Sequence, residues 1–204
     1  MIYEDKNLHS LITLEEFKAI MGIDARDDKN ARFCVLTATL TIEQYCQRQL
    51  LRKKYFETIP FGNSLVVPFR EYPVVEILAV YTFNKEQFVK DRGEILEPEF
   101  YRPMVGNDYN EEMTFELLFS PSLKPYNLAA VKVIYWAGYE HGAIPENLSA
   151  ACLELASWNF NRYKGRRVGM SGNIRGAGIQ GEHFEMSIPE NVKALIEPYR
   201  RKTI

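Results

Sequence analysis

The chain changes from a strand-like to a helix-like pattern within residues 131–163, which read VKVIYWAGYEHGAIPENLSAACLELASWNFNRY. Residues 131–136 are rich in β-branched and aromatic side chains and are followed by Gly138, a pattern that predicts a strand. Pro145 stands where the first position of a helix is expected. The apolar residues that then recur at helical spacing are Leu148, Ala151, Cys152, Leu155 and Trp158. The stretch therefore predicts a strand followed by a helix over 145–164.

Two further helices are predicted nearer the N-terminus. Thr13 and Glu16 have the spacing of a capping box, and Gly22 supplies a stop, which predicts a helix over 13–22. A second helix over 28–50 is predicted by an apolar stripe that comprises Cys34, Val35, Ala38, Ile42, Tyr45 and Cys46. We expect Leu155 and Trp158 of the third helix to pack on this stripe through Val35, Ala38 and Ile42.

The region between the second and third helices, residues 54–137, is predicted to be a β insertion. It contains short runs of β-branched and aromatic residues separated by Pro, Gly and Asn. We expect one antiparallel sheet built from Leu65–Phe69, Val74–Thr82, Met113–Phe119 and Val131–Trp136. The acidic segment Asn107–Glu112 is expected at a hairpin tip. Pro68 and Pro73 cannot donate ladder hydrogen bonds, so the strand around Pro68 is expected to lie at an edge or to be broken.

The C-terminal part of the sequence has a different composition. Six of the 12 glycines fall within residues 165–181, together with Arg166, Arg167 and Arg175. A segment so rich in glycine loses much backbone entropy on ordering, so we expect a mobile binding arm. A last helix is predicted by the capping residues Ser187 and Glu190 and by the stripe Val192, Leu195, Ile196 and Tyr199, with an end or kink near Glu197 because Pro198 follows.

These patterns together predict an α+β fold. A small helical bundle carries the antiparallel β insertion between its second and third helices, and an extended C-terminal arm ends in a helix. We expect residues 1–164 to form a single body and residues 165–204 to form the arm. No internal repeat is visible in the sequence.

Composition and charge limit the classes of function. The formal net charge of -2 provides no global attraction to nucleic acid or anionic lipid. The first residues lack the basic and apolar regions of a signal peptide, and no apolar run is long enough to span a bilayer. The three cysteines, Cys34, Cys46 and Cys152, lie in apolar helical patterns. We therefore expect a soluble protein, made in a reducing cytosol, with no disulfide and no membrane contact.

The sequence offers no pattern typical of catalysis or of a metal or cofactor site. His9, His141 and His183 are far apart, and none has the spacing of a helical zinc pair. Asp108, Asn110 and Glu112 alternate as at the start of a calcium loop, but Met113 replaces the required glycine. The glycines near Ser171 and Arg175 form neither a nucleophile elbow nor a phosphate loop. We expect no catalytic residue, no cofactor and no metal, and hence no enzyme.

Three blocks of the sequence, in this order, resemble the head-tail connector (adaptor) proteins of long-tailed bacteriophages. The blocks are SLVVPFREYPVVEILAV (64–80), VKVIYWAGYEHGAIPENLSAACLELASWNFNRY (131–163) and FEMSIPENVKALIEPYRR (184–201). The resemblance implies a structural virion protein at the head–tail junction, assembled in the host bacterial cytoplasm. It implies a ring, commonly of twelve subunits, that binds the portal protein and a downstream neck or tail-completion protein. DNA would pass through the ring without sequence-specific binding.

Two roles for the C-terminal arm follow from these expectations. As a docking element, its residues Arg166, Arg167 and Arg175 would face carboxylates or carbonyls of an adjoining ring. The terminal helix would fill an apolar groove with Val192, Leu195, Ile196 and Tyr199, and its rim would be anchored by Arg200 and Arg201. The alternative is a nucleic-acid-binding module that contacts phosphates through Lys164, Arg166, Arg167 and Arg175.

Overall fold

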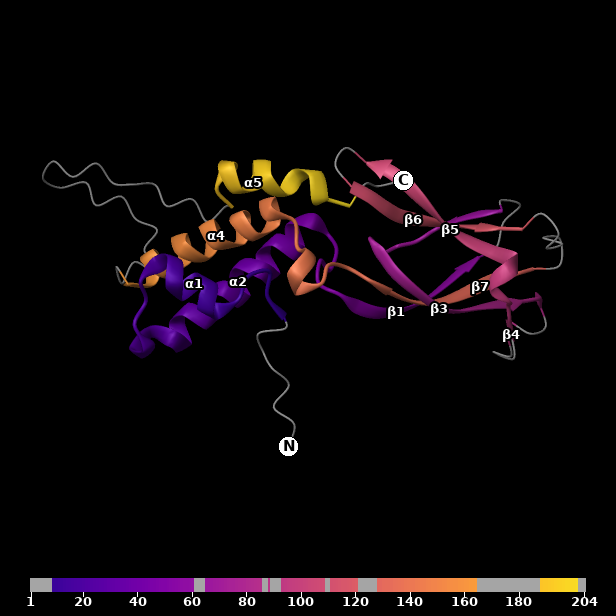
Figure 1. Ribbon diagram of the computed structural model, residues 1–204, viewed down its shortest axis with the longest axis horizontal. Coiled ribbons are helices and arrows are strands. Elements are labelled where there is room, and N and C mark those ends of the chain that lie inside the picture. The colour runs from indigo at the N-terminus through magenta and orange to yellow at the C-terminus, as the bar shows by residue number, and fades with distance from the viewer. Residues whose placement is uncertain are drawn as a thin grey trace, which may run out of the picture. The chain divides into compact units, whose positions relative to one another are not determined.

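The computed structural model describes residues 9–60, 65–85, 88, 93–108, 111–120, 128–164 and 188–201. These residues combine helices with antiparallel strands, which confirms the predicted α+β class (Figure 1). The chain divides into two compact units, one of residues Met1–Arg48 with His141–Ile204 and the other of residues Gln49–Glu140. Each unit is described below by itself. The glycine-rich part of the predicted arm, 165–187, lies outside the described residues.

The first unit is helical. Its α-helices are α1 (Leu14–Met21), α2 (Asp28–Cys46), α4 (Glu146–Lys164) and α5 (Glu190–Ile196), and its short 3-10 helices are η2 (Ala25–Asp27), η5 (His141–Ala143) and η6 (Glu197–Tyr199). The predicted capping box opens α1, since Glu16 N donates to Thr13 Oγ1 at 3.1 Å and Thr13 N donates to Glu16 Oε2 at 2.7 Å. Gly22 ends this helix in the left-handed conformation, at φ 61°.

Helix α2 ends four residues before the predicted end at residue 50. Gln47 adopts the left-handed conformation, at φ 55°, and its N–H bonds to the carbonyls of Gln44 and Glu43. A left-handed residue that ends a helix is usually glycine, and here it is glutamine. The end of α2 could therefore not be predicted from the sequence. The other unit begins two residues later, at Gln49.

The core of the helical unit lies between α1, α2, α4 and α5. Its buried apolar residues include Leu11, Leu14, Phe17, Ala31, Cys34, Val35, Ala38, Ile42, Cys46, Leu148, Ala151, Cys152, Leu155, Ala156, Phe160, Val192 and Ile196. Phe17 and Phe160 meet edge to face, with ring centroids 5.9 Å apart. The expected packing of α4 on α2 is present, and Leu155 is buried.

Trp158 differs from Leu155, and its expected packing on α2 stays a prediction. Its side chain is half-buried rather than part of the core, and the Arg162 guanidinium lies 4.5 Å from the centre of its ring. The buried positions of α4 follow a stripe through Leu148, Cys152, Ala156 and Phe160, so Trp158 lies at the margin of this stripe. An amphipathic ring at such a margin can cover apolar surface and still receive a cation.

The second unit contains two antiparallel sheets, so the prediction of one sheet was wrong. The four-stranded sheet has the order β1 (Lys53–Pro60), β7 (Ala130–Ala137), β3 (Val74–Phe83) and β4 (Glu94–Ile95). The three-stranded sheet has the order β2 (Val66–Pro68), β6 (Glu111–Phe119) and β5 (Tyr101–Asp108), and a 3-10 turn, η3 (Pro98–Phe100), precedes β5. The two predicted strands around Pro68 and Leu117 thus pair with each other and not with β3 or β7.

Two predicted details of the strands are confirmed. β2, with Pro68, is an edge strand, and Pro103 also lies in an edge strand, β5. β5 and β6 form a hairpin in which Asp108 pairs with Glu111, so the acidic segment is at its tip. β5 itself was not predicted, because its sequence YRPM lacks the run of apolar residues expected for a strand.

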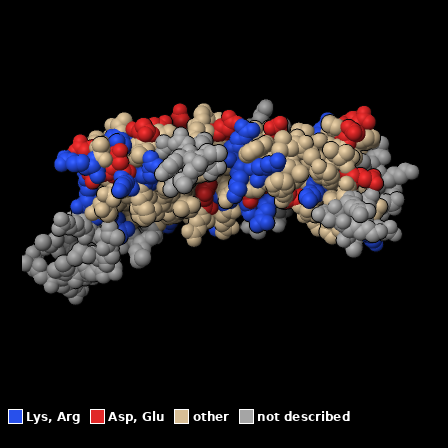
Figure 2. All heavy atoms as spheres, turned by 90° about the horizontal axis from the view of Figure 1, so that it is seen from below, with Lys and Arg blue, Asp and Glu red and all other residues tan. Residues whose placement is uncertain are grey.

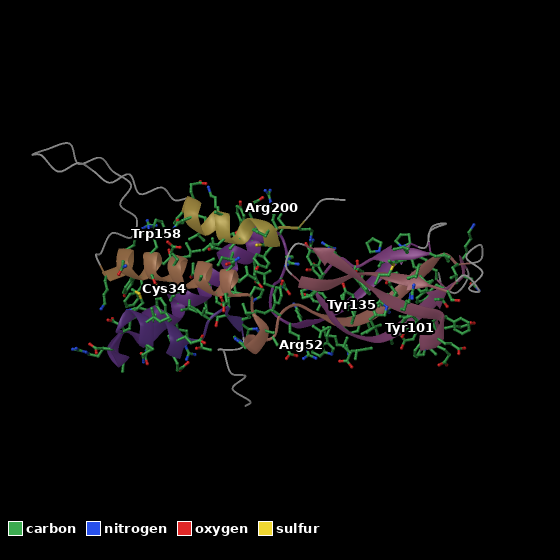
Figure 3. All side chains as sticks on the ribbon, turned by 45° about the horizontal axis from the view of Figure 1, so that its top comes forward. Cys34, Arg52, Tyr101, Tyr135, Trp158 and Arg200 are labelled. Atoms are coloured by element: carbon green, nitrogen blue, oxygen red, sulfur yellow. The ribbon has the colours of Figure 1, made fainter. Side chains whose placement is uncertain are left out.

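The core of the β unit lies against one face of the four-stranded sheet. Its members are Val67, Phe69, Val80, Leu117, Phe119, Val131, Val133, Tyr135 and Ala137. Tyr135, labelled in Figure 3, donates from its hydroxyl to Glu57 Oε2 at 2.7 Å and accepts from Glu71 N at 3.3 Å. Burial and the Glu57 carboxylate raise the pKa of Tyr135. The phenol therefore stays protonated and satisfies polar groups beside the core.

Candidate functional site

The predicted terminal helix is docked on its own helical unit. Helix α5 packs against α4, and its residues Val192 and Ile196 are fully buried. Cys46 in the last turn of α2 holds the end of this segment through two contacts: its Sγ donates to Ile196 O at 3.8 Å, and its carbonyl accepts from Arg201 N at 2.8 Å. Burial raises the pKa of the Cys46 thiol to about 11, so it remains a neutral donor.

Proline shapes the end of this segment as the sequence predicted. Helix α5 stops at Ile196 and continues as the 3-10 turn η6, which contains Pro198. Proline lacks an N–H and clashes with the preceding turn, so an α-helix cannot continue through it. At the other end of α5, the Asn191 amide donates to the Glu154 carboxylate on α4. The segment is therefore held at both ends.

Charged and aromatic side chains gather where the C-terminal segment meets the end of α2. The Tyr45 hydroxyl donates to Glu197 Oε2 at 2.5 Å, and this hydrogen bond raises the pKa of Tyr45. Arg200, labelled in Figure 3 near the end of α5, lies 5.6 Å from the Tyr45 ring centre and 3.7 Å from Glu197 Oε1. The last turn of α2 contains no basic residue of its own. Arg200 therefore brings positive charge to the negative end of that helix dipole.

The structure thus separates the predicted arm residues into three groups. Val192 and Ile196 are buried in their own unit, Leu195, Tyr199 and Arg201 are half-buried, and Arg200 is exposed. The predicted basic arm residues Arg166, Arg167 and Arg175 lie outside the described residues. That the terminal helix fills a groove on a neighbour stays a prediction. It would require α5 to leave the position in which it is seen.

Lys164, which the nucleic-acid alternative assigns to phosphate binding, is engaged within its own unit. Its Nζ lies 3.3 Å from Asp27 Oδ2 and 5.2 Å from the centre of the Phe160 ring. Over the helical part of the face drawn in Figure 2, basic and acidic side chains are interspersed. A phosphate would therefore have to compete with Asp27 for the Lys164 ammonium.

One face of the four-stranded sheet carries a group of exposed and half-buried apolar side chains, with Lys132 beside them, and the sequence patterns did not reveal this group. Phe56 pairs directly with Ile134, Ile134 pairs with Ala79, and Tyr81 pairs with Ile95, so these five side chains share the face opposite the core. Phe56 is 65% exposed and Ile95 is 64% exposed. We call these five residues the outer sheet face. In Figure 2, an area without charged side chains lies over the strands, beside a group of Lys and Arg.

Helix α2 carries a second exposed apolar surface. Phe33 is 68% exposed, Leu40 is 64% exposed, and Leu36 between them is half-buried. Their spacing of three, four and seven residues places them on one side of the helix, away from the buried stripe through Val35 and Ala38. We call Phe33, Leu36 and Leu40 the α2 stripe. In the sequence, the alternating residues of the strands indicate the outer sheet face, and a second apolar period in α2 indicates the α2 stripe. Neither surface was predicted, because the same apolar residues could all be assigned to the core.

The described residues contain neither a group of three potential metal ligands nor a helix long and apolar enough to cross a bilayer. The three cysteines are buried and unpaired with one another. Burial raises the pKa of each thiol to about 11. None of them is set up as a thiolate nucleophile, because that role requires a lowered pKa.

Comparison with known proteins gives a match in fold. No protein-family model matches the sequence, and no curated protein matches it. A chain in the neck of an empty gene transfer agent (GTA) particle, computed with C6 symmetry, is 15% identical with a TM-score of 0.57 over 100% of this chain and 95% of its own. A chain in the virion of a native GTA particle is 16% identical with a TM-score of 0.56, over 95% and 91%.

A third similar chain comes from the neck of a native GTA particle computed with C12 symmetry. It is 18% identical, with a TM-score of 0.53, over 100% of this chain and 94% of its own. At these identities the similarity establishes a shared fold. The fold extends over nearly the full length of each chain, so it includes both the helical unit and the β unit.

Proposed function

We propose that this chain is a structural neck protein of a phage-like particle. It forms a ring that joins the portal of the capsid to the tail or neck and continues the channel through which DNA leaves. The observation that carries the proposal is the fold shared with GTA neck chains over 95–100% of this chain. The C6 and C12 symmetries of those necks support an assembly of repeated subunits. We propose twelve subunits for this ring.

The proposed partners are proteins. They are further copies of this chain, the portal protein on one side, and a downstream neck or tail-completion protein on the other. The chain has no enzymatic role in this proposal, and DNA passes without sequence-specific contact. The place of action is the head–tail junction of the virion, after assembly in the host bacterial cytoplasm.

The C-terminal arm is the proposed docking element. Arg166, Arg167 and Arg175 would pair with carboxylates or carbonyls of the adjoining ring. Of the docked segment, Arg200 is exposed, and Tyr199 and Arg201 are half-buried, so these side chains are accessible while α5 stays in place. Val192 and Ile196 can contact a neighbour only after α5 has left its own unit, because both are fully buried there.

Attachment to capsids tests the proposal. The full chain is mixed with DNA-filled capsids that carry the portal but lack the neck, and the capsids are then sedimented. We expect the full chain to sediment with them and a chain shortened to residues 1–164 to remain in solution. The shortened chain loses the cover that α5 gives to the bundle, so its fold is checked first by circular dichroism. Failure of the full chain to bind capsids with a portal would contradict the proposed function.

A charge-matched pair of variants separates protein docking from the nucleic-acid alternative. The first variant replaces Arg166, Arg167 and Arg175 by Ala, and the control replaces three basic residues elsewhere, Arg26, Lys85 and Arg102. We expect the first variant alone to lose capsid attachment, and neither the parent chain nor the control to bind DNA. DNA binding that is lost in the first variant and falls steeply with salt would favour the alternative.

A further inference from the structure

We propose that the α2 stripe of one copy packs across the outer sheet face of the next copy in the ring. The inference rests on the proposed ring and names the two surfaces that build it. A closed ring needs two different, complementary surfaces on each subunit, because each copy meets its two neighbours through opposite sides. The two exposed apolar surfaces of this chain lie on different units, one on a helix and the other on a sheet.

The two surfaces match in kind. A sheet with one buried face and one apolar outer face is stable when a helix covers the outer face, which is a common layer arrangement in proteins. Here the inner face of the four-stranded sheet is buried in the core of the β unit, while Phe56 and Ile95 on its outer face are mostly exposed. Helix α2 has the reciprocal arrangement, with Ala38 buried and Leu40 exposed.

The two surfaces also match in length. Phe33 and Leu40 are seven residues apart, which corresponds to about 10 Å along a helix. The outer sheet face crosses from β1 to β4, three strand spacings or about 14 Å. A helix lying across the strands would therefore place its apolar side chains within the width of the apolar face. Beyond the two ends of the α2 stripe, the contact would involve the charged residues that flank the two surfaces.

The charges give this packing a direction. On the outer side of the sheet, one row joins Lys54 on β1, Trp136 on β7 and Glu76 on β3. Glu76 lies 4.0 Å from Arg52, whose guanidinium is 5.0 Å from the centre of the Trp136 ring, so the charge that this row offers to a neighbour is that of Lys54 on β1. On α2, Lys29 and Arg32 flank the Phe33 end of the stripe, and Glu43 flanks the Leu40 end. Opposite charges meet when the Leu40 end, with Glu43, lies over Lys54 on β1.

Disulfide trapping tests the contact directly. One preparation carries Leu40→Cys and a second carries Phe56→Cys, both at exposed positions, and the native cysteines are buried. The two full-length proteins are mixed at high concentration under mild oxidation. We expect a covalent pair between the two variants, and none when Leu40→Cys is mixed with the exposed control Lys85→Cys. Failure of the first mixture to cross-link would overturn the inference, as would pairing of Phe56→Cys mainly with itself.

A charge exchange gives an independent measurement. Glu43→Lys or Lys54→Glu alone should reduce the ring population seen by native mass spectrometry, and the double variant should restore it. The control double variant, Glu43→Lys with Lys85→Glu, should not restore it. Equal ring populations in all variants would overturn the proposed contact. If these variants still formed rings that attach to capsids, the proposed contact would be wrong but the proposed neck function would remain supported. The two proposals can therefore fail separately.

Discussion

Thr13 and Glu16 satisfy two backbone donors at the start of α1 that would otherwise have no partner within the helix. The threonine hydroxyl accepts from Glu16 N, and the glutamate carboxylate accepts from Thr13 N. The hydrogen bond from Thr13 N, with a further contribution from the Thr13 side chain, lowers the pKa of Glu16 from its ordinary value of 4.5, since both favour the charged carboxylate. One side chain thus ties the stability of the first helix to pH.

We predict that Glu16 stabilises the fold above its ordinary pKa and loses this contribution as the pH falls through its lowered pKa. The carboxylate binds a proton less readily in the folded state than in the unfolded state, so protonation at low pH favours unfolding. NMR titration should show the Glu16 carboxyl titrating below 4.5. Glu16→Gln should make the melting temperature less dependent on pH in the same acidic range.

Glu15→Gln is the matched control for the loss of a negative charge in the first turn of α1, because Glu15 lies in the same turn but outside the capping box. A Glu16 carboxyl that titrates at or above 4.5 would contradict the prediction.

The elements of this fold differ in how far their sequences determine them. The helices were predicted because their apolar period and caps are local, and the start of α4 at Glu146 lies one residue from the prediction. The pairing of the strands was not predicted correctly. A period of two indicates which side chains share a face, but not which strand lies alongside, so Leu117 on β6 could not be assigned to β2 in advance.

The placement of α5 shows the same limit for a helix. Its stripe, its end at Ile196 and the turn at Pro198 could be predicted from the sequence. An apolar stripe requires a surface to cover it, but does not specify whether that surface belongs to the same chain. The packing of Ile196 beside Cys46 could therefore not be predicted. The basic character of residues 200–201 was visible, but their position at the end of α2 was not.

We predict that Leu155→Ala destabilises the helical unit by about 2 to 5 kcal/mol, because it leaves a cavity where α4 packs in the core. Leu155 is 3% exposed, and the neighbouring positions Ala151 and Cys152 are fully buried. Denaturant unfolding measures the loss. Leu40→Ala, on the exposed side of α2, is the control and should change the free energy of unfolding by much less. An equal loss in both variants would show that Leu155 does not contribute to the core as described.

On the scale of the whole molecule, the β unit is an insertion whose two connections run side by side. Tyr139 N donates to Leu50 O at 2.7 Å, and Arg52 N donates to Tyr139 O at 2.9 Å. Gly138, at φ 98°, lies so close to Leu51 that a Cβ would be 2.5 Å from its carbonyl oxygen. The chain therefore enters and leaves the β unit at one place. An insertion with adjacent ends and a core of its own is typical of a separable domain.

We predict that residues 49–140 fold without the helical unit, because Tyr135, Val133 and Leu117 are fully buried within a core made from this segment alone. The reciprocal protein, with residue 48 joined to residue 141 by a short Gly/Ser linker, should keep its helices. Circular dichroism and cooperative thermal unfolding measure both. The control fragment 65–119 lacks β1 and β7, and with them half of the four-stranded sheet, so it should remain unfolded. If fragment 49–140 unfolds without cooperativity while the full chain melts in a single transition, the β unit depends on the helical unit for its stability, and the two units are one folding domain.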